Sequence, residues 1–292
     1  MVSPRPLSRR LIGHHACALR RSTLPHIFTY REMHDDDPSH APFSVGLRLL
    51  PQLAWRWLTD RRGQGNALIT GLLKGCIDHG CRLDLQAEVR RLTRDCSGRV
   101  TGVELDGRSI AARRGVLLAT GGFEWDETLR TRNFAGPLDR IGSPRGNTGD
   151  GQRMAAEAGA QLDRMDQANV YPTIPTVYEG KLHGLPITFQ AEPHAIVVNR
   201  HGQRFVSEYD FNIGEALDRR QADGSPLHLP AWVVADRRFL SRSLPLRVYA
   251  RRLPGWMRRA DSIVELARAI GVPGSRARRD RRALQLVLCG RP

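Results

Sequence analysis

The stretch GVLLATGGFEWD, residues 115–126, carries the pattern that decides the fold. Three apolar residues, 116–118, run into the small residues ATGG at 119–122, and an aromatic and acidic cluster follows at once. Such a run predicts a buried strand whose end lies open to a ligand, because glycine has no Cβ and leaves free N–H groups accessible. Ligands bind beyond the carboxyl ends of strands in open α/β sheets, so we expect residues 119–122 to lie against a nucleotide. The alternative is a glycine turn that only leaves the strand.

The segment before this stretch predicts a helix and a small meander. The helix is expected from Asn66, as its cap, to Gly80, with an apolar stripe that contains Leu68, Leu72 and Ile77. Short strands are expected over 82–85, 88–94 and 99–105, with turns at 95–98 and 106–107, and residues 109–119 return to the core.

A second glycine-containing element is GNTGDG, residues 146–151, at the start of a helix expected over 150–159. Backbone donors at a helix start suit anionic or polar ligand atoms. The alternative is that Asp150 merely caps the helix.

The third element is VVNRHGQRFVSE, residues 197–208, which follows a strand expected over 195–198. Its Arg204 and Glu208 are close enough in sequence to pair, which would be a structural role. The functional alternative is that the Arg204 guanidinium points at a carbonyl or carboxylate of a substrate. A further strand is expected over 231–235, and an amphipathic helix over 262–270 with Asp261 as a possible cap.

Composition limits the classes of function. The 292 residues carry a net charge of +15 and contain 45 basic side chains, of which only Lys74 and Lys181 are lysines. A nucleic-acid-binding protein is one reading of this charge, but the arginines are spread along the chain without a recognisable motif. No apolar run approaches the about 20 residues of a membrane span. The cysteines form no CxxC pair, so no metal site is expected. Their scattered positions predict reduced thiols in a cytoplasmic protein.

Taken together, in this order and spacing, the stretches GVLLATGGFEWD, GNTGDGQRMAAEAGA and AIVVNRHGQRFVSE resemble the flavoprotein family of soluble fumarate reductases and 3-ketosteroid dehydrogenases. The resemblance runs from about residue 30 to residue 273. It implies FAD as the cofactor, held by Val89, Ala119, Thr120, Gly121, Gly122, Asn147, Thr148, Gly149, Asp150 and Gly151. It also implies hydride transfer between flavin N5 and one carbon of a C–C bond next to a carbonyl or carboxylate of a small-molecule substrate, with a proton moving at the neighbouring carbon.

The resemblance is incomplete. The GxGxxG fingerprint of the family and its closing C-terminal segment are missing, so the chain is interpreted as an internal fragment of a longer enzyme. The positions of the fumarate reductase proton path hold Thr188 and Ala191, and Tyr171 stands where those enzymes carry a histidine before Pro-Thr. Arg204 is therefore the candidate for substrate polarisation, with Tyr171 and Tyr209 as candidates for proton transfer.

These inferences predict an α/β fold with an α+β capping part. Residues 1–165 are expected to form a partial Rossmann-like FAD-binding domain with a β-meander, residues 166–273 a partial substrate-capping domain, and residues 274–292 an aberrant or disordered tail. The predicted function is an FAD-dependent dehydrogenase or reductase, or a fragment of one. The alternatives are a non-catalytic remnant of such a flavoenzyme and a basic nucleic-acid-binding protein.

Overall fold

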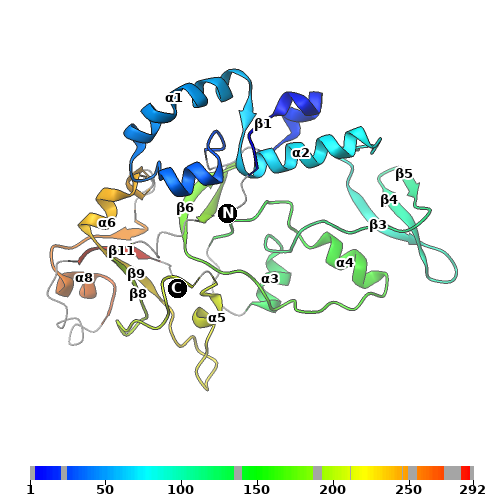
Figure 1. Ribbon diagram of the computed structural model, residues 1–292. Coiled ribbons are helices and arrows are strands. Elements are labelled where there is room, and N and C mark those ends of the chain that lie inside the picture. Colours follow the sequence, from blue (N-terminus) through cyan, green and yellow to red (C-terminus); the bar gives the residue numbers. More distant parts are fainter. Residues whose placement is uncertain are drawn as a thin grey trace. The chain divides into compact units, whose positions relative to one another are not determined.

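The computed structural model describes residues 4–20, 25–134, 140–186, 193–210, 212–244, 246–248, 255–272 and 284–289. Figure 1 shows the mixture of helices and short strands, which belong to two compact units: residues 1–83 with 238–252, and residues 84–237 with 253–292. The division expected at residue 165 stays a prediction. Of the expected tail, residues 284–289 are described, and they form strand β11.

The first unit contains two long helices, α1 (Pro42–Leu58) and α2 (Gln64–Asp78). Its shorter elements are β1 (Leu7–Ser8), η1 (Arg9–Ala18), η2 (Glu32–Asp36), β2 (Arg61–Arg62) and α6 (Arg237–Arg242), which begins at the unit boundary. Arg56 is largely buried on α1 and donates to both carboxylate oxygens of Glu32, at 2.7 and 2.8 Å. Because a buried charge requires a partner, this ion pair fixes α1 against the first residue of η2.

Both long helices of the first unit leave apolar side chains exposed. The buried positions of α2 include Ala67 and Thr70, whereas Leu68 and Leu72 are exposed. The prediction that Leu68 and Leu72 face the core is therefore wrong, because no described residue covers that face of α2. Gly63, not Asn66, is the N-terminal cap, and Gly80 ends the helix in the left-handed conformation as expected.

The second unit begins with the expected meander. Strands β3 (Val89–Arg94), β4 (Val100–Leu105) and β5 (Arg108–Ala111) pair antiparallel in the order β3-β4-β5 (Figure 1). The two turns lie where expected, and Asp95 accepts from the backbone of Ser97 and Arg99. Residues 82–85, expected as a strand, are not one.

A four-stranded sheet with the order β10-β11-β9-β8 forms the main core of this unit. It joins β8 (Ala195–Val198), β9 (Trp232–Asp236), β10 (Met257–Arg258) and β11 (Leu284–Cys289). Helix α8 (Ile263–Ala269) buries Leu266 and Ala267 against Val198, Trp232 and Val234. Ser262, rather than Asp261, caps α8 and accepts from Glu265 N–H at 3.2 Å.

The second unit also contains helices and a hairpin outside these two sheets. They are α3 (Glu127–Asn133), α4 (Asp150–Glu157), α5 (Gly214–Leu217) and the antiparallel hairpin of β6 (Thr173–Tyr178) and β7 (Lys181–Pro186).

The expected buried strand before the glycine pair is absent. Residues 115–123 belong to no helix or strand, Gly121 has a positive φ of 81°, and Leu117 is 91% exposed. A strand needs a neighbour that takes up its backbone N–H and C=O groups, and among the described residues none does so for 116–118. The prediction of a strand is therefore wrong, because neither its sheet pairing nor the burial of Leu117 is found among the described residues.

Candidate functional site

The two glycine-containing loops lie against each other. Gly149 N–H donates to the Gly122 carbonyl at 3.1 Å, and Trp125 N–H donates to the Asn147 carbonyl at 3.0 Å. The Gln152 side chain adds a third link, since its Nε2 donates to the Gly121 carbonyl at 3.1 Å. Residues 119–122 and 147–152 therefore form one continuous surface, here called the glycine cradle.

An ion-pair network connects the two helix starts that flank the glycine cradle. Arg153 on α4 pairs with Asp126 at 2.6 Å and with Asp150 at 2.5 Å. Asp126 also caps α3 by accepting from Leu129 N–H, and this hydrogen bond is foremost among the interactions that lower the pKa of its carboxyl. The network ties the start of α4 to the start of α3, so the loops between them have fixed ends.

The glycines of the cradle are required by the packing of the two loops. A Cβ at Gly121 would stand 2.9 Å from Asn147 Cγ, and one at Gly151 would collide with Thr120 Oγ1. Gly121 and Gly149 also have φ of 81° and 79°, a region that disfavours other residues. The space that the missing side chains leave is thus filled partly by protein, which the idea of an open strand end did not predict.

The outer side of the cradle still presents unpaired donors. Residues 119–121 are exposed, and among the described residues no acceptor takes up the backbone N–H groups of 119–122. Asp150 does not act as a side-chain cap of α4; it accepts from Thr148 Oγ1 at 2.7 Å and pairs with Arg153. Clustered free N–H groups of this kind bind acceptor atoms of a ligand.

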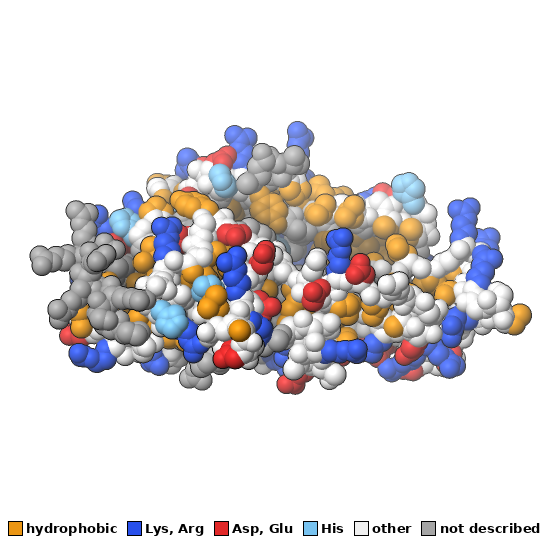
Figure 2. Space-filling view, turned by 90° about the horizontal axis from the view of Figure 1, so that it is seen from below, with side chains coloured by type: hydrophobic (Ala, Val, Ile, Leu, Met, Phe, Trp, Pro, Cys, Tyr) orange, Lys and Arg blue, Asp and Glu red, His pale blue; other side chains and the backbone are white. Residues whose placement is uncertain are grey.

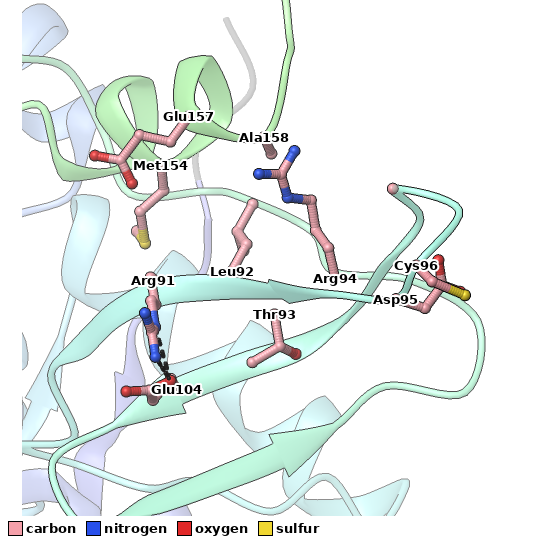
Figure 3. Close-up of a pocket in the computed structure, with 11 residues that line it drawn as sticks. Arg91, Leu92, Thr93, Arg94, Asp95, Cys96, Glu104, Met154, Glu157 and Ala158 are labelled. Carbon is pink, nitrogen blue, oxygen red and sulfur yellow. Dashed lines mark hydrogen bonds and ion pairs between the residues drawn. The ribbon is translucent and has the colours of Figure 1, made fainter.

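A cavity of about 580 Å³ lies between the meander and α4 (Figure 3). Its polar lining includes Arg91 and Arg94 on β3 and Glu157 on α4, and Met154 extends into it from α4 (Figure 3). Arg91 donates to Glu104 at 2.8 Å across the sheet. None of the site residues expected from the sequence lines this cavity, Val89 included, although α4 and β3 pack together.

Arg204 lies in the loop after β8 and is held by Glu208. Its Nε donates to Glu208 Oε1 at 2.9 Å and its Nη2 donates to Oε2, while Glu208 also accepts from Val197 N–H at 2.9 Å. Burial raises the pKa of Glu208, but hydrogen bonds from Arg204 and Val197 outweigh it and leave this pKa below its usual value. The expected structural pair is thus present, and the Arg204 side chain remains 60% exposed with no described partner for Nη1.

The two candidate tyrosines have different surroundings. Tyr171 is partly buried, and burial together with the charge of Glu124 raises the pKa of its hydroxyl. Tyr209 is 80% exposed. Next to Tyr171, Val170 N–H donates to Asn212 Oδ1 at 3.0 Å, and both residues line a second cavity of about 590 Å³. Thr188 and Ala191 lie outside the described residues.

Two residues at the cradle were missed by sequence reasoning, Glu124 and Gln152. Glu124 belongs to the aromatic and acidic cluster directly after the glycine pair, and this position in the sequence could have indicated it as a site residue. Gln152 had no signal of its own, because only the observed turn of α4 points it at Gly121.

Charge is distributed rather than gathered on the visible face. In Figure 2 the blue lysine and arginine groups are interspersed with red carboxylates, and hydrophobic atoms lie open between them. Among the described residues, no helix is long and apolar enough to cross a membrane, and no three metal-ligating side chains come together.

Similarity to known proteins shows which family the chain belongs to. The FAD binding domain family matches residues 9–278. The chain is 37% identical over 224 residues to a 4-oxocyclohexanecarboxylate 2-dehydrogenase of Sinomonas cyclohexanicum, covering 72% of this chain and 39% of that protein. It is 33% identical over 256 residues to a 3-oxosteroid 1-dehydrogenase of Mycobacterium tuberculosis, covering 78% and 44%.

A solved structure agrees with these matches. A 3-ketosteroid Δ1-dehydrogenase of Sterolibacterium denitrificans, in complex with 1,4-androstadiene-3,17-dione, superposes with a TM-score of 0.78 at 28% identity. The superposition covers 94% of this chain and 54% of that one, so the chain spans about half the length of the relatives that it matches. The chain belongs to the FAD binding domain family of flavoproteins, as its three glycine and arginine motifs predicted.

Proposed function

We propose that this chain binds FAD at the glycine cradle and supplies part of a flavin-dependent dehydrogenase. The observation that carries the proposal is the hydrogen-bonded junction of residues 119–122 with 147–152, which leaves a row of unpaired backbone donors outside. Backbone donors next to a helix start suit the acceptor atoms of a dinucleotide. The buried acceptor oxygens of Glu124 and Gln152 beside them fit a group that also carries donors. In the finer fold proposed here, the first residues to about 165 form part of a Rossmann-like FAD domain and residues 166–273 part of a capping domain.

The proposed reaction is removal or addition of hydrogen at a C–C bond next to a carbonyl or carboxylate. When bound, FAD accepts or supplies the hydride. The relatives are dehydrogenases of an oxocyclohexane carboxylate and of 3-oxosteroids, which supports a cyclic ketone as the substrate class.

Arg204 is proposed to polarise the substrate carbonyl. Its Nε and Nη2 are oriented by Glu208, so the edge that carries Nη1 points away from the ion pair and can donate to an oxygen. A guanidinium fixed in this way loses little side-chain entropy when it binds, and it stays charged at any working pH.

Tyr171 is proposed to handle the proton in preference to Tyr209. A raised pKa keeps the Tyr171 hydroxyl protonated at neutral pH, as an acid requires. Tyr209 is exposed to solvent, and only its position directly after the RFVSE stretch supports a role in proton transfer.

The alternative of a non-catalytic remnant has an observation in its favour, the exposure of Leu117 and of apolar side chains on α1 and α2.

The test of the proposed function is an assay of the purified chain with added FAD. It follows the reduction of an artificial electron acceptor with 4-oxocyclohexanecarboxylate and with a 3-oxosteroid as substrates. The enzyme predicts a yellow protein that turns over one of them and loses at least tenfold in rate when Arg204→Leu is introduced. A yellow but inert protein supports the remnant, and a colourless folded protein refutes FAD binding.

A further inference from the structure

Two buried acceptor oxygens flank the glycine pair without a partner. Glu124 Oε2 and Gln152 Oε1 are both inaccessible to solvent, and no described residue donates to either. A buried acceptor that makes no hydrogen bond costs about 1–3 kcal/mol, so two such acceptors at neighbouring glycines call for an explanation.

The Glu124 carboxylate is folded back onto the main chain of the pair. Its Oε2 and Oε1 lie 2.7 and 2.9 Å from the point where a Cβ of Gly122 would stand. Only a glycine at this position leaves room for the carboxylate, so the side chain of Glu124 and the bare backbone of Gly122 form one feature.

The orientation of the Gln152 amide is fixed by its other hydrogen bond. Its Nε2 donates to the Gly121 carbonyl at 3.1 Å, and a carbonyl accepts only from the NH₂ end of an amide. The free end of Gln152 is therefore the acceptor, and exchanging the two amide ends would break the observed bond.

We propose that Glu124 and Gln152 bind hydrogen-bond donors of the flavin dinucleotide, a sugar or ribityl hydroxyl or a ring N–H. This inference rests on the proposed function and deepens it. A carboxylate repels phosphate, so this end of the cradle takes an uncharged, donor-bearing part of the ligand, while the N–H groups of 119–122 take its acceptors.

The test measures affinity for parts of the cofactor. Quenching of flavin fluorescence gives the Kd for FAD and riboflavin, and calorimetry gives the Kd for ADP. Glu124→Gln keeps the size of the side chain and replaces one acceptor by a donor, and Gln152→Leu removes the acceptor. Exposed matched controls are Glu127→Gln and Gln161→Leu.

The proposal predicts that both cradle variants bind FAD at least tenfold more weakly, while both controls keep the wild-type Kd. Loss confined to riboflavin assigns the ribityl chain or ring, and loss confined to ADP assigns the adenosine ribose. Cradle variants that bind every probe as the wild type does overturn the proposal. If the wild-type chain binds no probe, the proposed function itself fails.

Urea unfolding of each variant separates lost binding from lost folding.

Discussion

Substituting Gly121 by alanine separates the two reasons for a glycine at this position. The backbone there has φ of 81°, and a side chain in this left-handed region costs about 1–2 kcal/mol. The added Cβ would also stand 2.9 Å from Asn147 Cγ, and overpacking of that kind costs typically about 1–3 kcal/mol. Gly121→Ala should therefore destabilise the chain by about 2–5 kcal/mol in total.

Gly98 is the matched control, because it has φ of 84° and nothing lies within 4 Å of its Cβ position. Gly98→Ala should cost only the backbone part, about 1–2 kcal/mol. Adding Asn147→Ala to Gly121→Ala should remove the packing part and bring the loss down to that of Gly98→Ala. The assay is urea unfolding at equilibrium. If Gly121→Ala costs no more than Gly98→Ala, the two loops of the cradle are not in contact and the reasoning is refuted.

Further changes test the supports of the fold. Glu208→Gln should cost about 1–3 kcal/mol, because Glu208 accepts charge-assisted hydrogen bonds while buried. Since the pKa of Glu208 is lowered on folding, its contribution is present above the ordinary value of about 4.3 and is lost as pH falls through the lower folded value. Unfolding free energies measured from pH 7 to 3 should thus fall less in Glu208→Gln than in wild type, and parallel curves would contradict this. Ser262→Ala should cost about 1 kcal/mol in thermal unfolding through the lost cap of α8, and no change would show the cap to be unimportant. Arg56→Met alone should cost about 3–5 kcal/mol in urea unfolding, and adding Glu32→Leu should recover most of it; failure to recover would contradict a buried ion pair.

Local patterns predicted the meander and its turns well, because their determinants are neighbours in sequence. Asp95 and Gly98 specify their turn through contacts within four residues, and β3 and β4 pair directly across that turn. The burial of residues 116–118 and of Leu68 and Leu72 could not be predicted in the same way. Burial depends on a covering partner, and apolar character alone does not tell whether the described chain provides one.

The glycine motifs predicted which segments form the candidate site, but not why the glycines are there. Their roles in loop packing, such as Gly151 beside Thr120, depend on the approach of two segments about 30 residues apart. The orphaned oxygens of Glu124 and Gln152 are likewise properties of three-dimensional surroundings. From the sequence, Arg204 was expected either to point at a substrate or to form a structural pair with Glu208. The pair with Glu208 is present.

Hydrogen exchange at the glycine cradle, with and without FAD, tests the central claim most directly. The backbone N–H groups of 119–122 have no described acceptor, so they should exchange fast in the free chain. Binding of FAD should slow exchange there and at the start of α4, and leave the turn at 95–98 unchanged. Bound FAD that leaves 119–122 exchanging as fast as before would contradict the account.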